Sequence, residues 1–339
     1  MILLIFLAGF VQGGVVPAEP GELHLRNVHQ LTFGGQNAEA YFSASGKLLI
    51  FQRQGPAEQC DQMYVMAVDR GGLHRVSSGS GRTTCGYFYD RDRRIFYSST
   101  EHASPDCPPR PDYSHGYVWA LYDYDIYTAN ADGSGARRLT TNPEYDAEAT
   151  LSPHGRTIVF TSLRAGDLDI YTMSVDGSHL KRLTTTLGYD GGPFFSPDGR
   201  RIVYRAFHPQ TAADSLEYRS LLAKRLARPT HMDLWVMNAD GSDQHQVTHL
   251  PGASFAPYFH PDGRRIIFSS NYEHPESRDF DLYLVNADGT GLERITTAPE
   301  FDAFPMFSPD GTRLMWASNR HGNAPHETNL FIAEWVEQP

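Results

Sequence analysis

The stretch SPDG at residues 308–311, which also occurs at 196–199, decides the fold of this 339-residue chain. Two close variants are SPHG at 152–155 and HPDG at 260–263. Each copy precedes a short apolar run and then an (Asp/Asn)-(Leu/Ile)-aromatic segment. Proline second and glycine fourth are typical of a type I turn followed by a left-handed residue, which joins two antiparallel strands. Self-similarity at this period predicts a repeat architecture.

Six repeat units can be aligned on the residue before each turn. These residues are Phe42, Phe88, Leu151, Phe195, Phe259 and Phe307, and their spacings are 46, 63, 44, 64 and 48. In one unit the predicted strands are Gly192–Ser196, Arg201–Arg205, Asp233–Asn238 and His245–Thr248. Six four-stranded antiparallel meanders predict an all-β fold, a six-bladed β-propeller.

The two ends of the chain predict how the ring closes. The last unit lacks a fourth strand, and residues 28–33 (VHQLTF) match the fourth-strand pattern of the other units. We therefore expect the N-terminal strand to complete the last blade, which removes the open sheet edges. The predicted propeller is a single domain over residues 28–337.

Two spacings contain long insertions, at residues 101–124 and 207–230. Both lie between the second and third strands of a blade, so we expect both on one face, called the top face here. Residues 212–227 lack Gly and Pro and follow Thr211, which predicts a helix. Residues 101–124 are rich in Pro and aromatic residues and predict an ordered loop. Loops on a rigid scaffold commonly carry binding sites.

The N-terminus predicts export. Residues 1–20 begin with an apolar run, Met1 to Val11, which is typical of a signal peptide and too short to span a bilayer. The alternative is a buried first strand. We expect a periplasmic or secreted monomer without a membrane span.

The three cysteines, Cys60, Cys85 and Cys107, allow at most one internal disulfide. An exported protein favours one disulfide, and the sequence leaves the pair open. Three free thiols or a zinc site are the alternatives.

The charge balance argues against a nucleic-acid partner. Lys and Arg number 29 against 40 Asp and Glu, a net charge of −11, and no long basic run is present.

Residues that recur in most units are interpreted as architecture. An aspartate stands two residues before the third-strand aromatic in four units, at Asp125, Asp169, Asp233 and Asp281. We expect these carboxylates to hold strand ends or neighbouring loops rather than to catalyse a reaction.

Two carboxylates break the repeat. The position three residues before the aligned residue is acidic only at Glu39 and Glu148. Since innermost strands border the central channel, we expect both near its mouth, where they could capture an amine, a metal or a peptide N-terminus. Alternatively, they accept hydrogen bonds from inner-strand N–H groups or pair with an arginine.

Other candidates for binding on the top face are Arg53, His102, Arg164, Arg205, His274, Arg320, Tyr113 and Trp119. The arginines could hold carboxylates of a peptide or acidic sugar, or pair with the chain's own aspartates. His102 and His274, with Glu39 and Glu148, could ligate a metal. No histidine pair has close ligand spacing, so no metal and no other cofactor is predicted.

The repeats resemble the WD-like Pro-Asp-Gly repeats of the TolB-like β-propeller family, over roughly residues 28–337, and are similar to those of peptidase-associated propellers. The resemblance implies a propeller of the cell envelope that binds a protein or peptide. No Gly-x-Ser-x-Gly, zinc-protease or phosphate-binding motif is present, so no catalytic residue is predicted. The alternatives are a metal-assisted lyase or hydrolase at the channel mouth, and an accessory propeller to a separate peptidase.

Overall fold

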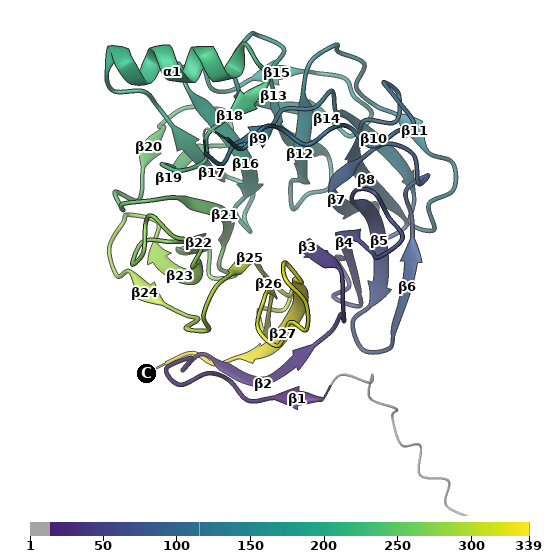
Figure 1. Ribbon diagram of the computed structural model, residues 1–339, viewed down its shortest axis with the longest axis vertical. Helices are drawn as coiled ribbons and strands as arrows, with labels where there is room; N and C mark the ends of the chain where they lie inside the picture. The colour runs from purple at the N-terminus through teal and green to yellow at the C-terminus, as the bar shows by residue number, and fades with distance from the viewer. Residues whose placement is uncertain (1–13, 115, 339) are drawn as a thin grey trace, which may run out of the picture.

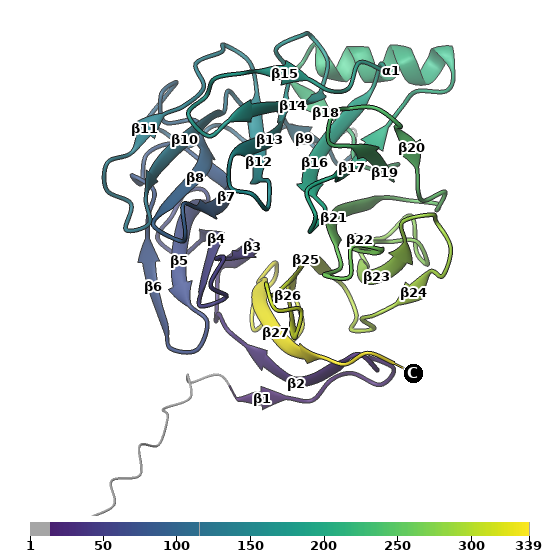
Figure 2. The same cartoon turned by 180° about the vertical axis from the view of Figure 1, so that it is seen from behind.

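A computed structural model describes residues 14–114 and 116–338 and confirms the six-bladed β-propeller. The sheets surround a central axis, and each is a meander of four antiparallel strands, extended in the last blade (Figures 1 and 2). Blade 1 holds β3 (Gln36–Phe42), β4 (Leu48–Gln54), β5 (Gln62–Ala67) and β6 (Gly71–Arg75). Blade 2 holds β7 (Thr83–Tyr89), β8 (Arg94–Ser99), β10 (Asp125–Asn130) and β11 (Arg137–Arg138). Blade 3 holds β12 (Asp146–Leu151), β13 (Thr157–Ser162), β14 (Asp169–Ser174) and β15 (Lys181–Arg182).

The remaining blades follow the same order. Blade 4 holds β16 (Tyr189–Phe195), β17 (Arg201–Phe207), β19 (Asp233–Asn238) and β20 (His245–Gln246). Blade 5 holds β21 (Ser254–Phe259), β22 (Arg265–Ser270), β23 (Asp281–Asn286) and β24 (Glu293–Arg294). Blade 6 holds β25 (Asp302–Phe307), β26 (Arg313–Ser318), β27 (Asn329–Trp335), β2 (Leu25–Gln30) and β1 (Val15–Val16).

The Ser-Pro-Asp-Gly turn is built from its own side chains. In blade 6, the Ser308 hydroxyl donates to Asp310 Oδ1 at 2.5 Å, and the same carboxylate oxygen accepts from the N–H of Thr312 at 3.1 Å. Gly311 has a φ of 72° and donates its N–H to the Ser308 carbonyl at 2.8 Å. Because glycine adopts this left-handed conformation without steric cost, the motif reverses the chain within four residues.

The recurring aspartates hold the outer two strands of blades 2 to 5 together. In blade 5, Thr296 Oγ1 accepts from the N–H of Leu282 at 2.9 Å and donates to Asp281 Oδ1 at 3.4 Å, while Arg294 pairs with Asp281 at 2.6 Å. Thr140, Thr184 and Thr248 make the same contacts with Asp125, Asp169 and Asp233. Because the network recurs from blade to blade, these carboxylates are structural.

The N-terminal strand closes the ring. β2 pairs with β27, with Leu25 opposite Trp335 and Gln30 opposite Phe331, so blade 6 contains both ends of the chain. β2 starts three residues before the predicted 28–33 segment and ends at Gln30. Residues 1–13 of the predicted signal peptide lie outside the described residues. Within its remainder, Val15–Val16 pairs with β2.

The two insertions contact one another. The segment 101–124, called the strap here, contains β9 (Trp119–Ala120), which pairs with β18 (Leu226–Ala227) of the second insertion. A disulfide joins Cys107 of the strap to Cys60 of blade 1, and Cys85 is a buried free thiol.

The helix in the second insertion is shorter than predicted. α1 (Ala212–Leu222) starts at a capping box formed by Thr211 and Asp214, but it ends five residues before the predicted 227. The reason is that Leu226 and Ala227 are taken into the pairing with β9, which requires extended backbone. No helix among the described residues is long and apolar enough to cross a membrane.

Candidate functional site

Each innermost strand carries a β-bulge with one residue in the left-handed conformation. The strand register shifts at this point in β3, β7, β12, β16, β21 and β25, which surround the central axis in Figure 1. The left-handed residues are Glu39, Cys85, Glu148, Gly192, Ala256 and Phe304, with φ from 49° to 59°. A bulge changes the direction in which a side chain points. The left-handed backbone conformation costs of order 1 kcal/mol for a residue other than glycine. The bulge therefore sets the positions of the Glu39 and Glu148 side chains.

Glu148 forms a buried ion pair with Arg205. Both side chains are largely shielded, at 11% and 9% exposure, and the guanidinium contacts Glu148 Oε1 directly. The other carboxylate oxygen accepts from the N–H of Gly192 at 2.8 Å and from the Thr161 hydroxyl at 2.7 Å. Arg205 also donates to the Tyr189 hydroxyl at 2.6 Å. Burial alone would lower the pKa of Arg205, but the Glu148 charge raises it above its usual range, so the guanidinium stays charged.

Glu39 has only neutral hydrogen-bond partners among the described residues. Its Oε2 accepts from the Cys85 thiol at 3.1 Å and from the Thr84 hydroxyl at 3.4 Å. Burial raises the pKa of the Glu39 carboxyl, and burial likewise raises that of the Cys85 thiol well above its usual value. Glu39 interacts electrostatically with both Glu148 and Arg205, so it lies near the ion pair without joining it. It is a half-buried carboxylate without a cation of its own.

Aromatic rings close the channel below these carboxylates. Two residues after the bulge stand Tyr41 in β3, Tyr87 in β7, Phe194 in β16 and Tyr258 in β21. The Tyr41 ring lies 5.7 Å from that of Tyr87 and 5.5 Å from that of Phe194, which belongs to the opposite blade. Phe194 also makes an edge contact with Tyr258 at 5.4 Å. The carboxylates and the ring contacts beside them, which form an aromatic floor across the channel, are together called the cup here.

The strap borders this cup. Trp119 packs over Arg205, with the guanidinium carbon 5.0 Å from the ring centre, and lies 6.0 Å from the Tyr189 ring. Farther along the strap, Tyr117 lies under Arg278 of blade 5, at 5.1 Å. The strap thus extends from blade 2 to blades 4 and 5 and covers the Glu148–Arg205 pair.

Of the residues singled out in the sequence, the structure gathers Glu39, Glu148, Arg205 and Trp119. The other three arginines bind the chain's own polar groups. Arg164 pairs with Asp146 at 2.7 Å, and Arg320 pairs with Glu22 at 2.7 Å and Asp302 at 2.8 Å. Arg53 donates to Asn37 Oδ1 at 2.6 Å.

The histidines and Tyr113 lie apart from the cup. His102 Nε2 is 3.3 Å from the structural carboxylate of Asp125, and His274 is exposed on a loop of blade 5. Tyr113 is exposed and stacks on Tyr117 at 5.8 Å. Within residues 14–114 and 116–338, no three His, Cys, Asp or Glu side chains converge as a metal site would require.

The sequence reasoning missed Tyr189 and the aromatic floor as parts of the site. The floor had a sequence signal, because aromatic residues occupy the position directly before the aligned residue in four of the six units. Tyr189 had none, since its contact with Arg205 joins two different strands of blade 4.

Comparisons with known proteins agree with the propeller fold. A family model described as the TolB beta propeller domain matches residues 120–215 and 227–326. The structure is similar to that of putative TolB from Agrobacterium tumefaciens, at 20% identity and a TM-score of 0.58, over 90% of this chain and 91% of that one. TolB from Acinetobacter baumannii is similar at 14% identity and a TM-score of 0.58, over 78% of this chain and 55% of that one.

A structure of oligogalacturonate lyase in complex with manganese is also similar, at 14% identity and a TM-score of 0.52, over 91% of this chain and 93% of that one. No curated protein matches the chain by sequence. At these identities the solved structures show the shared fold, and a shared fold does not by itself identify a function.

Proposed function

The chain belongs to the TolB β-propeller family, and on this premise we propose that it is a binding module whose channel mouth holds the amino end of a peptide or of a partner protein. The observation that carries the proposal is Glu39, a half-buried carboxylate above an aromatic floor that lacks a cation among the described residues. A buried carboxylate gains most from a partner that supplies positive charge. Aromatic faces also attract cations.

The two halves of the mouth differ in character, which supports a peptide rather than a simple cation. Blades 1 to 3 contribute Glu39, Cys85 and Glu148. Blades 5 and 6 contribute Phe255 and Phe304, whose rings lie 5.5 Å apart in an edge contact. A peptide N-terminus combines an ammonium group with an apolar side chain and fits both halves. Glu148 is less available to this ligand, because Arg205 already neutralises it.

We place this activity in the periplasm or outside the cell. The apolar N-terminal run and the Cys60–Cys107 disulfide support this location, because disulfides persist in oxidising compartments. Cell fractionation of the tagged full-length protein tests it.

Isothermal titration calorimetry with the peptide Leu-Ala-Ala and its N-acetylated form tests the binding proposal. We expect the free amine to bind at least tenfold more tightly, and Glu39→Gln to remove this difference while the Thr84 and Cys85 hydrogen bonds persist. Glu276→Gln, at an exposed carboxylate of blade 5, is the matched control and should bind like the wild type. Equal binding of both peptides, or binding insensitive to Glu39→Gln, would refute the proposal.

The metal-assisted lyase or hydrolase has less support. It would need His102, His274, Glu39 and Glu148 to converge, and they do not form a cluster of ligands among the described residues. Elemental analysis of the purified protein distinguishes the two functions. Stoichiometric metal together with absent peptide binding would favour the enzyme.

A further inference from the structure

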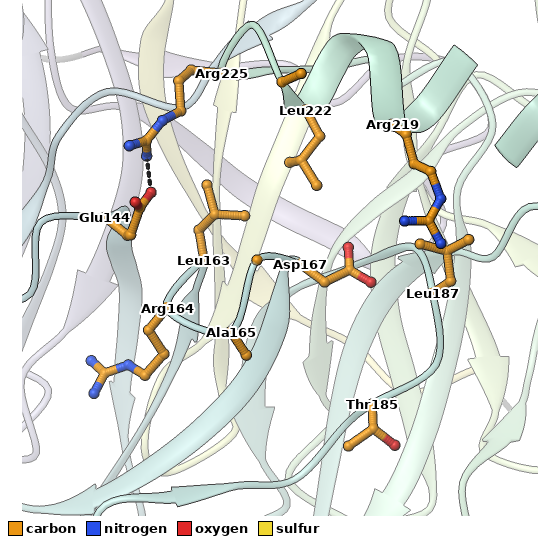
Figure 3. Close-up of a pocket in the computed structure, with 12 residues that line it drawn as sticks. Glu144, Leu163, Arg164, Ala165, Asp167, Thr185, Leu187, Arg219, Leu222 and Arg225 are labelled. Atoms are coloured by element: carbon orange, nitrogen blue, oxygen red, sulfur yellow. Dashed lines mark ion pairs between the residues drawn. The ribbon is translucent and has the colours of Figure 1, made fainter. Parts of the chain in front are cut away.

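A hollow lies beside α1, away from the channel mouth. It has a volume of about 650 Å³ and is bordered by the helix, by the loop between β13 and β14, and by the loop between β15 and β16 (Figure 3). None of the six bulge residues lines it. We call it the α1 groove. Its volume is in the range of pockets that hold small ligands.

The α1 groove exists because of how the second insertion folds. α1 ends at Leu222, and the chain then turns through Ala223 to reach the pairing of β18 with β9. Ala165 and Gly166 face it from the β13–β14 loop. Small side chains on both sides leave the space between them unfilled.

The lining combines positive charge with an aliphatic surface. Three arginines line the groove, Arg164, Arg219 and Arg225, against two carboxylates, Glu144 and Asp167. Leucines at 163, 187 and 222 provide the aliphatic surface, and they belong to or pack against the buried cluster around Tyr218.

The carboxylates and two of the arginines are already engaged. Arg225 pairs with Glu144 at 2.5 Å, and Arg164 pairs with Asp146 at 2.7 Å. Asp167 accepts from the Tyr218 hydroxyl at 2.5 Å, and it also accepts the backbone N–H groups of Leu168 and Gly188.

Arg219 differs from these groups. Across the described part of the chain, its guanidinium makes no ion pair and no side-chain hydrogen bond. Figure 3 shows it extending from the helix toward Leu187. The α1 groove therefore presents one available guanidinium next to leucine side chains.

We propose that the α1 groove binds the C-terminal residue of a peptide that ends in an aliphatic side chain. The α-carboxylate pairs with Arg219, whose planar guanidinium can hold both oxygens of a carboxylate. The side chain packs on Leu163 and Leu222. A fatty acid shares this chemistry but needs an enclosed apolar tunnel for its tail, whereas the α1 groove is open and half polar. This site is independent of the amine-binding cup, and either can exist without the other.

Calorimetry on the full-length protein with N-acetyl-Ala-Ala-Leu as the free acid and as the C-terminal amide tests this site. Because both peptides lack a free amine, neither can use the cup. We expect the free acid to bind at least tenfold more tightly than the amide, and Arg219→Gln to remove that difference. Lys224→Gln, at a nearby exposed cation outside the lining, is the matched control, and Glu39→Gln should also bind like the wild type.

Three outcomes would overturn the proposal. They are equal binding of the acid and the amide, wild-type affinity in Arg219→Gln, and no binding of the free acid at millimolar concentration. Tight binding of decanoate without binding of the peptide would assign the groove to a fatty acid instead. Since Arg219 is exposed on a helix, its substitution is not expected to unfold the protein, and thermal unfolding checks this.

Discussion

Replacing Arg205 with methionine tests the energetics of the channel mouth most directly. The change keeps most of the aliphatic stem but leaves Glu148 as a charged carboxylate at 11% exposure. Removing one partner of a buried ion pair costs ~3–5 kcal/mol. The Trp119 ring, 5.0 Å from the guanidinium, adds a cation–π contact of ~1 kcal/mol that is also lost. Because the N–H of Gly192 and the hydroxyl of Thr161 still bind the carboxylate, we expect a net loss of ~3 kcal/mol in the free energy of unfolding at pH 8.

Two further variants separate the ion pair from simple packing. Arg205→Met combined with Glu148→Gln removes the orphaned charge, so most of the loss should be recovered. Arg93→Met is the control at an exposed pair with Asp90, and it should cost less than ~1 kcal/mol. Denaturant unfolding at pH 8 measures all four proteins.

Two results would refute this reasoning. The first is a single variant within 0.5 kcal/mol of the wild type, a margin of about the size typical of neutral surface changes. The second is a double variant as unstable as the single one, which would mean that packing of the guanidinium, not charge, accounts for the loss.

Three other predictions concern the scaffold. Cys60→Ser combined with Cys107→Ser removes the disulfide, which closes a loop with a sequence separation of 47. We expect the free energy of unfolding to fall by ~4 kcal/mol, from the chain-entropy model. Equal stability of the oxidised wild type and the variant in urea would contradict this expectation. Burial raises the pKa of Asp281 to about 7, above its value in the unfolded chain. The contribution of this carboxyl group to the free energy of unfolding is therefore complete below pH ~4 and is lost as the pH rises through 7. Asp281→Asn should therefore flatten the decline in stability between pH 4 and 7, whereas a steeper decline would disprove this assignment. Thr211→Ala removes an N-cap worth ~1 kcal/mol, so amide hydrogens of α1 should exchange about fivefold faster; unchanged exchange would show that tertiary contacts alone hold the helix.

Features set by local pattern were predictable from the sequence. The Ser-Pro-Asp-Gly turns, with Gly311 in the left-handed conformation, place each hairpin. The recurring aspartates could be interpreted as structural because recurrence is visible in the sequence. The predicted length of α1 was wrong, because Leu226 and Ala227 pair with the strap, and this is a contact between distant segments of the chain. Local propensity carries no information about such a contact.

The candidate site was only partly predictable. The break in the repeat identified Glu39 and Glu148, but nothing in the sequence distinguished the roles of the two carboxylates. Tyr41 and Phe194 meet across the channel from opposite blades, so their contact exists only in the closed ring.

The sequence by itself determined the ring, because turn chemistry and strand alternation act over a few residues and repeat in every blade. Only the tertiary structure decided which charges meet at the centre. Arg205 pairs with Glu148 of the neighbouring blade, while Asp190 of its own blade is held by His208 at 2.9 Å. The physical reason is that Arg205 and Glu148 belong to different blades, so they meet only when blades 3 and 4 lie side by side in the ring. This packing leaves Glu148 neutralised and Glu39 without a cation among the described residues.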